Sequence, residues 1–148
     1  MKYIPNELLF EEAKRLIANK ENVIMRGKGS SMYPYLREGK DAVVLSPFQP
    51  NELKKGVIAL FQHSGRYILH RIVERKINCW VMQGDGVFRS REEVPEQNII
   101  AIVHTVVRSG GKEVSTRSAG ARLYWYCWYN VRPFRRYLLA FLHYIVRY

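Results

Sequence analysis

The sequence predicts a mainly β fold: a coiled, barrel-like antiparallel sheet with a helix before it and an amphipathic helical tail after it. Three observations support this prediction: short β-branched runs between turn residues, an early segment with helical spacing, and a closing segment rich in arginine and aromatic residues. Many short strands with turns between them are typical of all-β sheets that coil or close. We therefore divide the chain into a helix at residues 1–21, a β domain at 22–115 and a tail at 116–148.

The first expected element is a helix at residues 5–19, where Leu9, Ala13, Leu16 and Ile17 recur at helical spacing. We expect this helix to pack across one end of the sheet rather than to act as a lid over a substrate. Strands are expected at residues 22–26, 41–45, 56–63, 67–75, 79–83, 98–108 and 112–114. Turn residues after the third and fourth of these strands imply antiparallel neighbours.

Length and charge bound the possible functions. The chain has 148 residues and a formal net charge of +11, which suits one domain with a real core and an attraction to anionic surfaces. We expect a peptide or preprotein substrate and an anionic membrane surface as partners, and no nucleic acid. Two cysteines, Cys79 and Cys127, and four scattered histidines lack a metal-site spacing, so neither a metal nor a cofactor is expected.

The sequence also bears on location. No secretory signal is visible at the N-terminus, and no apolar run reaches the ~20 residues that a spanning helix needs. The expected location is therefore cytoplasmic, or peripheral on the inner face of the membrane.

The most informative stretch for function reads Gly27-Lys28-Gly29-Ser30-Ser31-Met32-Tyr33-Pro34-Tyr35-Leu36. Glycines permit backbone geometry that other residues resist, and Pro34 fixes φ, so the stretch predicts a shaped turn that presents a hydroxyl. A serine nucleophile needs such a presentation, a base within hydrogen-bond reach and donors for an oxyanion. The alternative is an ordinary Gly/Ser/Pro surface loop.

Three later segments follow in order: Gly56 to Phe61, Tyr67 to Val73, and Gln83-Gly84-Asp85-Gly86. Together with the Ser-Met-x-Pro turn they resemble the signal peptidase I and LexA-type serine peptidase superfamily, over roughly residues 23–107. A histidine directly before an arginine resembles the Ser-His branch, which includes the endoplasmic-reticulum and sporulation-type signal peptidases. The resemblance implies a signal peptidase/LexA-like fold.

By the same resemblance, Ser31 is the nucleophile, His70 the base and Asp85 a candidate for the acid that orients His70. The sequence departs from the family at two places. Gly29 stands where the lysine-type branch has a serine that helps to bind the oxyanion. In the His branch a further aspartate follows the Gly-Asp turn, whereas residues 87–93 here contain none.

Strand alternation gives His70 a suitable setting for a general base. It places Ile68, His70 and Ile72 on one face of the strand, and an apolar surrounding disfavours the charged imidazolium. A neutral ring can accept a proton. The alternative is a core histidine satisfied by a backbone carbonyl. The other histidines, His63, His104 and His143, do not precede an arginine.

The predicted function is that of a serine endopeptidase of signal peptidase type. It would cleave a leader or signal-like peptide after small residues, with Ser31 and His70 as the catalytic pair. Two alternatives are a LexA-like regulator that cleaves itself, for which Ala119-Gly120 resembles the cleaved dipeptide, and a catalytically silent peptide-binding module on the same scaffold.

The tail poses a separate question. Residues 121–148 hold ten of the nineteen aromatic residues and no acid, and their arginines are Arg122, Arg132, Arg135, Arg136 and Arg147. An apolar stripe at helical spacing comprises Leu138, Phe141, Leu142 and Ile145. We expect a basic amphipathic helix on an anionic membrane. The alternative is that these aromatics cover the domain's own sheet or a dimer partner.

Overall fold

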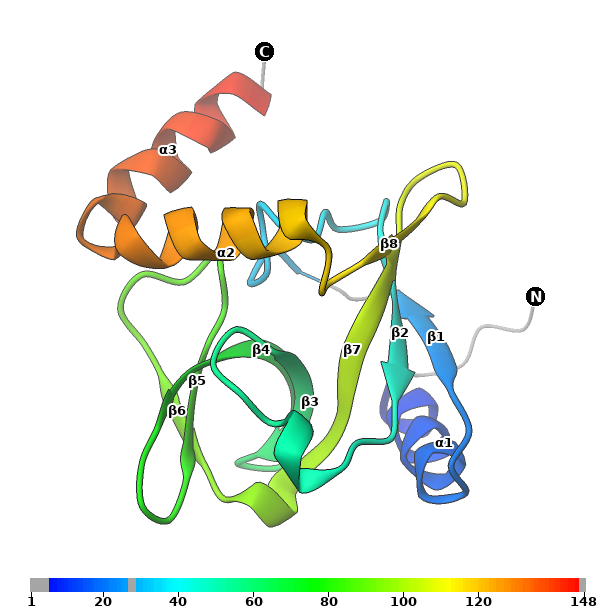
Figure 1. Ribbon diagram of the computed structural model, residues 1–148. Coiled ribbons are helices and arrows are strands. Elements are labelled where there is room, and N and C mark those ends of the chain that lie inside the picture. The colour runs from blue at the N-terminus through cyan, green and yellow to red at the C-terminus, as the bar shows by residue number, and fades with distance from the viewer. Residues whose placement is uncertain (1–5, 27–28, 147–148) are drawn as a thin grey trace.

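The computed structural model describes residues 6–26 and 29–146, so Gly27 and Lys28 of the serine motif lie outside the described residues. One antiparallel sheet forms the body of the molecule, with helix α1 beside one edge and helices α2 and α3 across one end (Figure 1). The strand order is β1-β2-β7-β3-β4-β5-β6, and β8 pairs with β7.

The strands are β1 (Val23–Arg26), β2 (Ala42–Ser46), β3 (Ile58–His63), β4 (Arg66–Arg75), β5 (Trp80–Gln83), β6 (Glu92–Val94), β7 (Ile99–Val107) and β8 (Glu113–Ser115). The helices are α1 (Asn6–Ala18), α2 (Ala119–Asn130) and α3 (Arg135–Val146), with short 3₁₀ turns η1 (Pro50–Glu52), η2 (Glu96–Asn98) and η3 (Arg132–Phe134). These elements confirm the expected mainly β class, the N-terminal helix and a C-terminal helix. Strand β6 and helix α2 were not predicted.

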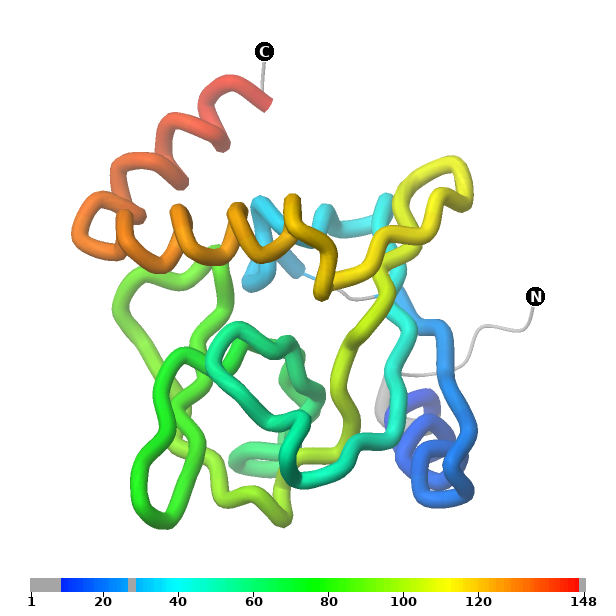
Figure 2. The backbone as a smooth tube through the Cα atoms, in the orientation of Figure 1, coloured from blue at the N-terminus to red at the C-terminus, as the bar shows by residue number. Residues whose placement is uncertain are grey.

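The expected closure into a barrel is wrong. The strands curl strongly, as Figure 2 shows, and bulges at Val44/Leu45, Leu60/Phe61 and Ile72/Glu74 increase the local twist. Strands β1 and β6 nevertheless stay at opposite ends of the hydrogen-bonded path, and no pairing joins them among the described residues. Both edge strands are short, with four and three residues, which leaves little backbone to pair across the remaining gap.

Alternation along the central strand divides the core into two clusters. Ile58 and Leu60 of β3 point into one cluster with Val103 and Val106, which helix α1 covers through Ile17. In the other cluster, Ala59 and Phe61 of β3 pack with buried side chains that include Ile72, Trp80, Met82 and Ile102. Helix α1 contacts β1 and β7, as expected for a helix that packs at the edge of the sheet.

The C-terminal segment is not a free tail. Helix α2 begins at Ala119, near the start of the predicted tail, and the side chain of Ser118 caps it by accepting a hydrogen bond from the Ala121 N–H. Trp128 of α2 and Leu139 of α3 are buried, so both helices pack against the body of the protein. Among the described residues, no helix is long and apolar enough to cross a membrane.

Candidate active site

The turn that carries Ser31 is fixed to the core at several points. Met32 and Tyr35 are buried, and the Tyr33 N–H donates to the Ser30 carbonyl over 3.0 Å. Gly29 has a φ of +87°, which a side chain would resist, and its N–H donates to Glu38. These anchors leave Ser31 half-buried at the surface of the turn.

His70 lies in the middle of β4 and is only 6% exposed. Its ring meets Phe61 edge-on, with 6.1 Å between the ring centroids. Ile68 and Ile72 pack into the same cluster as Phe61, whereas Leu69 packs into the other one. This arrangement confirms the face that strand alternation assigned to His70.

The structure brings Ser31 and His70 together across the Gly84 turn. The Gly86 N–H donates to the Ser31 carbonyl over 2.8 Å. A Cβ on Gly84 would lie 2.2 Å from that carbonyl oxygen and 3.0 Å from His70 Nε2, so only glycine fits at this contact. Within the described part of the chain, Ser31 and His70 make no direct hydrogen bond, but they line one pocket of about 370 Å³.

The walls of this pocket come from three parts of the fold. Phe10 of α1 and Met25 of β1 line it together with Leu60 of β3. Leu36, Val43 and Leu45 add further apolar surface next to Ser31 and His70. A mostly apolar cavity with a few convergent polar groups is the usual form of a small-molecule or peptide-binding site.

The carboxylate beside His70 belongs to Glu92, a residue that the sequence analysis did not select. Its Oε2 lies 3.1 Å from His70 Nδ1, and both side chains are largely buried, at 8% and 16% exposure. Glu92 is the first residue of β6, which pairs with β5. The signal was present, because Glu92 lies in the short segment after the Gly-Asp turn where the family has its further aspartate.

Asp85, expected to orient His70, is bound elsewhere. Its Oδ1 accepts from Arg71 Nε over 2.9 Å and its Oδ2 from Arg71 Nη2 over 2.8 Å. The Tyr124 hydroxyl adds a hydrogen bond to Oδ2 over 2.9 Å, and no described contact joins Asp85 to His70. The carboxylate that contacts His70 is therefore that of Glu92, whereas Asp85 forms an ion pair with Arg71.

Helix α2 encloses this ion pair. The rings of Tyr35, Tyr124 and Trp125 lie within 6 Å of the Arg71 guanidinium, and the Trp128 Nε1–H donates to the Asp85 carbonyl over 2.9 Å. Burial alone would lower the pKa of Arg71, but the Asp85 carboxylate outweighs it and raises that pKa. Burial and the charge of Asp85 raise the pKa of the Tyr124 phenol. Arg71 Nη1 also donates to the Gly56 carbonyl over 2.9 Å, so each nitrogen of the buried guanidinium has an acceptor.

No described contact joins the other histidines to Ser31 or His70. His63 ends β3 at the hairpin turn, His104 on β7 lies 3.4 Å from Glu52, and His143 of α3 stacks on Tyr33. Among the described residues, no group of three or more His, Cys, Asp or Glu side chains could hold a metal ion.

No family model, no curated protein and no solved structure matches this chain. The likeness to signal peptidases therefore depends on the ordered motifs alone. What the site can do chemically follows from its geometry: the turn that carries Ser31, the His70 imidazole and the Glu92 carboxylate come together beside a mostly apolar pocket.

Proposed function

We propose that this protein is a serine endopeptidase of signal peptidase type, with Ser31 as nucleophile, His70 as general base and Glu92 as the residue that orients His70. The observation that carries the proposal is the convergence of the Ser31 turn and the His70–Glu92 pair at Gly84. The motif resemblance supports the same two central residues. The substrate class that this resemblance implies is a precursor with a signal-like or leader peptide and a small residue before the scissile bond.

The hydrogen bond to Glu92 sets the tautomer of His70. A carboxylate at Nδ1 favours the proton on that nitrogen and leaves the lone pair on Nε2, the atom that faces Gly84 and Ser31. His70 Nε2 would take the proton from the Ser31 hydroxyl as its oxygen attacks the substrate carbonyl carbon. The same proton would then pass to the leaving amine, which frees the acyl-enzyme for attack by water.

The oxyanion needs donors at the reacting carbonyl. Among the described residues, the Ser31 N–H has no hydrogen-bond acceptor, so it is available to the substrate oxygen. Nucleophile–base contacts are often longer without substrate and shorten when substrate binds, which suits a pair that shares a pocket without a direct hydrogen bond.

The test uses the full chain and signal-like peptides, with Ser31→Ala and His70→Ala as active-site variants. Ser30→Ala is the matched control, because Ser30 is the adjacent and more exposed serine. We expect a loss of at least about a thousandfold in kcat/KM for each active-site variant and little change for the control. Equal cleavage by all four proteins would refute the proposal.

Labelling by a fluorophosphonate separates an enzyme from a silent binding module on the same scaffold. Labelling that disappears in Ser31→Ala and persists in Ser30→Ala supports an activated Ser31. Self-cleavage at Ala119-Gly120 is less well supported, because these residues form the first turn of α2 and not an extended segment. An unchanged intact mass after long incubation at raised pH would exclude it.

A further inference from the structure

Helix α3 has a buried apolar side and, next to it, an exposed apolar side. One side faces the protein through the buried Leu139 and the half-buried Leu138 and Leu142. The other side is exposed. We define the apolar face of α3 as Phe134, at the end of η3, together with Tyr137, Phe141 and Ile145 of α3, which are 63%, 64%, 60% and 51% exposed. The apolar stripe is therefore wider than the buried side of the helix, and part of it is exposed to solvent.

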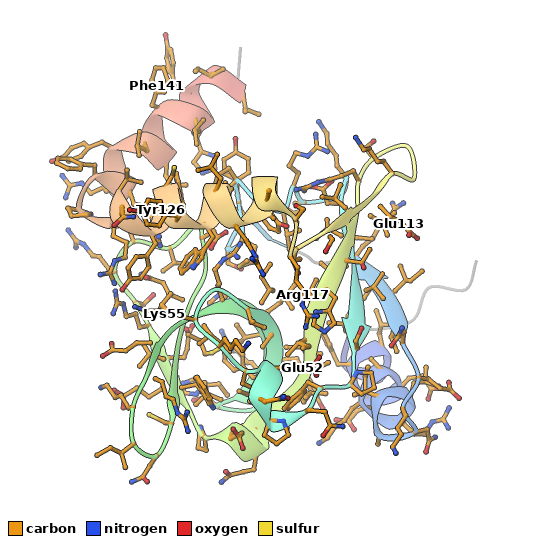
Figure 3. The ribbon with its side chains drawn as sticks, in the orientation of Figure 1. Glu52, Lys55, Glu113, Arg117, Tyr126 and Phe141 are labelled. Atoms are coloured by element: carbon orange, nitrogen blue, oxygen red, sulfur yellow. The ribbon has the colours of Figure 1, made fainter. Side chains whose placement is uncertain are left out.

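The exposed apolar residues of the protein concentrate in this region. Of the eleven large apolar residues described as exposed, the eight in α2, η3 and α3 are Leu123, Tyr126, Phe134, Tyr137, Phe141, Tyr144, Ile145 and Val146. Figure 3 shows Phe141 on the side of α3 that points away from the sheet. Contiguous exposed apolar surface usually marks a contact with a partner or a membrane.

All formal charges in this region are positive. The sequence contains no acid after Glu113. Arg122 and Arg136 are exposed, and the guanidinium of Arg136 lies 5.0 Å from the centre of the Tyr137 ring. Arg135 was expected among the cations that face a membrane, but it is buried. It is 2% exposed and donates hydrogen bonds to the carbonyls of Val87 and Trp128.

Further cations border these helices around Tyr129 of α2. Arg132 lies 4.2 Å and the Lys55 ammonium 4.6 Å from the centre of its ring. The pKa of the Tyr129 phenol lies below its usual value, mainly because Lys55 donates a hydrogen bond to it and also because Arg132, Lys55 and Arg91 are close. The potential over this end of the molecule is therefore positive.

We propose that the apolar face of α3 and the exposed arginines of the C-terminal helices dock on an anionic lipid surface. Aromatic rings beside arginines suit the boundary between headgroups and acyl chains, where one end of the side chain is apolar and the other is hydrated. A second copy of this chain fits less well, because face-to-face pairing would bring cations against cations.

The docked surface lies next to the candidate active site. His143 of α3 stacks on Tyr33, two residues after Ser31, with 5.0 Å between the ring centroids. A bilayer on the outer side of α3 would hold the Ser31 turn close to peptides at that surface. The inference itself concerns binding and does not depend on the proposed peptidase activity.

The experiment measures co-sedimentation of the full chain with phosphatidylcholine vesicles, with and without phosphatidylserine. One variant makes the face polar (Phe134→Ser, Tyr137→Ser, Phe141→Ser), and a second removes charge (Arg122→Gln, Arg136→Gln). We expect binding to the anionic vesicles only, a loss of at least about tenfold in the polar variant, and a loss of about fivefold for each arginine removed. High salt should weaken the wild-type binding.

Matched controls carry the same changes elsewhere. Ile77→Ser with Phe88→Ser removes exposed apolar side chains, and Lys40→Gln with Lys112→Gln removes exposed cations, in both cases outside the three C-terminal elements. All variants alter exposed residues, so circular dichroism and thermal melting should show intact folds. Three results would each overturn the proposal: no binding to either vesicle type, equal binding to both, or a stable dimer that the polar variant abolishes without vesicle binding.

Discussion

His70 and Arg71, on the two faces of strand β4, differ in how many of their hydrogen-bonding groups have a partner. His70 points to a pocket, has one carboxylate partner at Nδ1 and keeps Nε2 open toward the Ser31 turn. Arg71, the next residue, points the other way, where Asp85, a backbone carbonyl and three aromatic rings surround it. The comparison teaches that the residue proposed as the base keeps one ring nitrogen without a partner among the described residues, whereas the buried charge beside it has an acceptor at every nitrogen.

The largest expected effect comes from Asp85→Asn, which tests the buried ion pair on the Arg71 face of β4. The variant leaves the buried Arg71 charge without its anion, so we expect the free energy of unfolding to fall by about 4 kcal/mol in urea. Glu74→Gln is the control, because Glu74 lies 4.0 Å from Arg91 in an exposed pair and should leave the urea midpoint unchanged. If Asp85→Asn kept wild-type stability and lost activity, Asp85 would belong to the catalytic face after all.

Gly84→Ala tests the close contact of Gly84 with the Ser31 carbonyl and the His70 ring. The added methyl would overlap the Ser31 carbonyl and touch His70 Nε2, so we expect a loss of about 3 kcal/mol in stability together with loss of peptidase activity. Gly120→Ala is the matched control. A Cβ there would meet nothing within 4 Å, and alanine favours the helix, so α2 should tolerate it. Wild-type melting and turnover in Gly84→Ala would contradict the close approach.

Glu92→Gln tests whether the carboxylate positions His70. We expect about a hundredfold lower kcat/KM. A neutral amide is a weaker hydrogen-bond acceptor for the Nδ1–H of His70 than a carboxylate, and it does not stabilise a positively charged ring. Glu93→Gln is the neighbouring control: Glu93 is exposed and pairs with Lys76. The melting temperature of both variants should stay near that of the wild type, and Glu92→Asp should recover part of the rate. Equal rates for Glu92→Gln and Glu93→Gln would remove Glu92 from the mechanism.

The smallest expected effect on stability is that of Tyr124→Phe, which removes one hydrogen bond from the Arg71–Asp85 ion pair. Loss of the hydrogen bond to the Asp85 carboxylate should cost about 2 kcal/mol at neutral pH. The folded-state pKa of Tyr124 is raised above its unfolded value, so this group contributes stability that is fully present below about pH 10 and is lost as pH rises further. The stability gap between wild type and variant should therefore narrow above about pH 10. If urea titrations showed that this stability gap widens above about pH 10, the raised pKa of Tyr124 in the folded state would be wrong.

Local patterns predicted most of the fold. Helix α1 and seven of the eight strands follow from helical spacing, β-branched runs and turn residues, because these signals lie within each element. Strand β6 was missed because two of its three residues are glutamates, which are depleted in strands, and because no Gly-Gly turn precedes it as one precedes β8. Helix α2 was missed because its aromatic residues lie on both its buried and its exposed sides, so that no single apolar face stands out.

The candidate site was predicted in part. The Ser31 turn and His70 carry local motifs, and alternation assigned the strand face of His70. The partners of the two acids depend on tertiary contacts instead: Glu92 meets His70 across 22 residues and Asp85 meets Tyr124 across 39. A sequence that places His70 and Arg71 side by side does not say which of them the following Gly-Asp turn will contact.

The enclosure of Asp85 by α2 has a consequence for the order of events during synthesis. The Asp85 carbonyl is held by Trp128, 43 residues later, so the ribosome must finish α2 before this turn acquires its last contacts. The turn also supplies the Gly86 N–H that holds the Ser31 carbonyl. Contacts between distant residues form late because closing a long loop costs entropy. A nascent chain that has made only the sheet should therefore hold Ser31 loosely, and nucleophile reactivity should arise only after α2 has been synthesised and has docked.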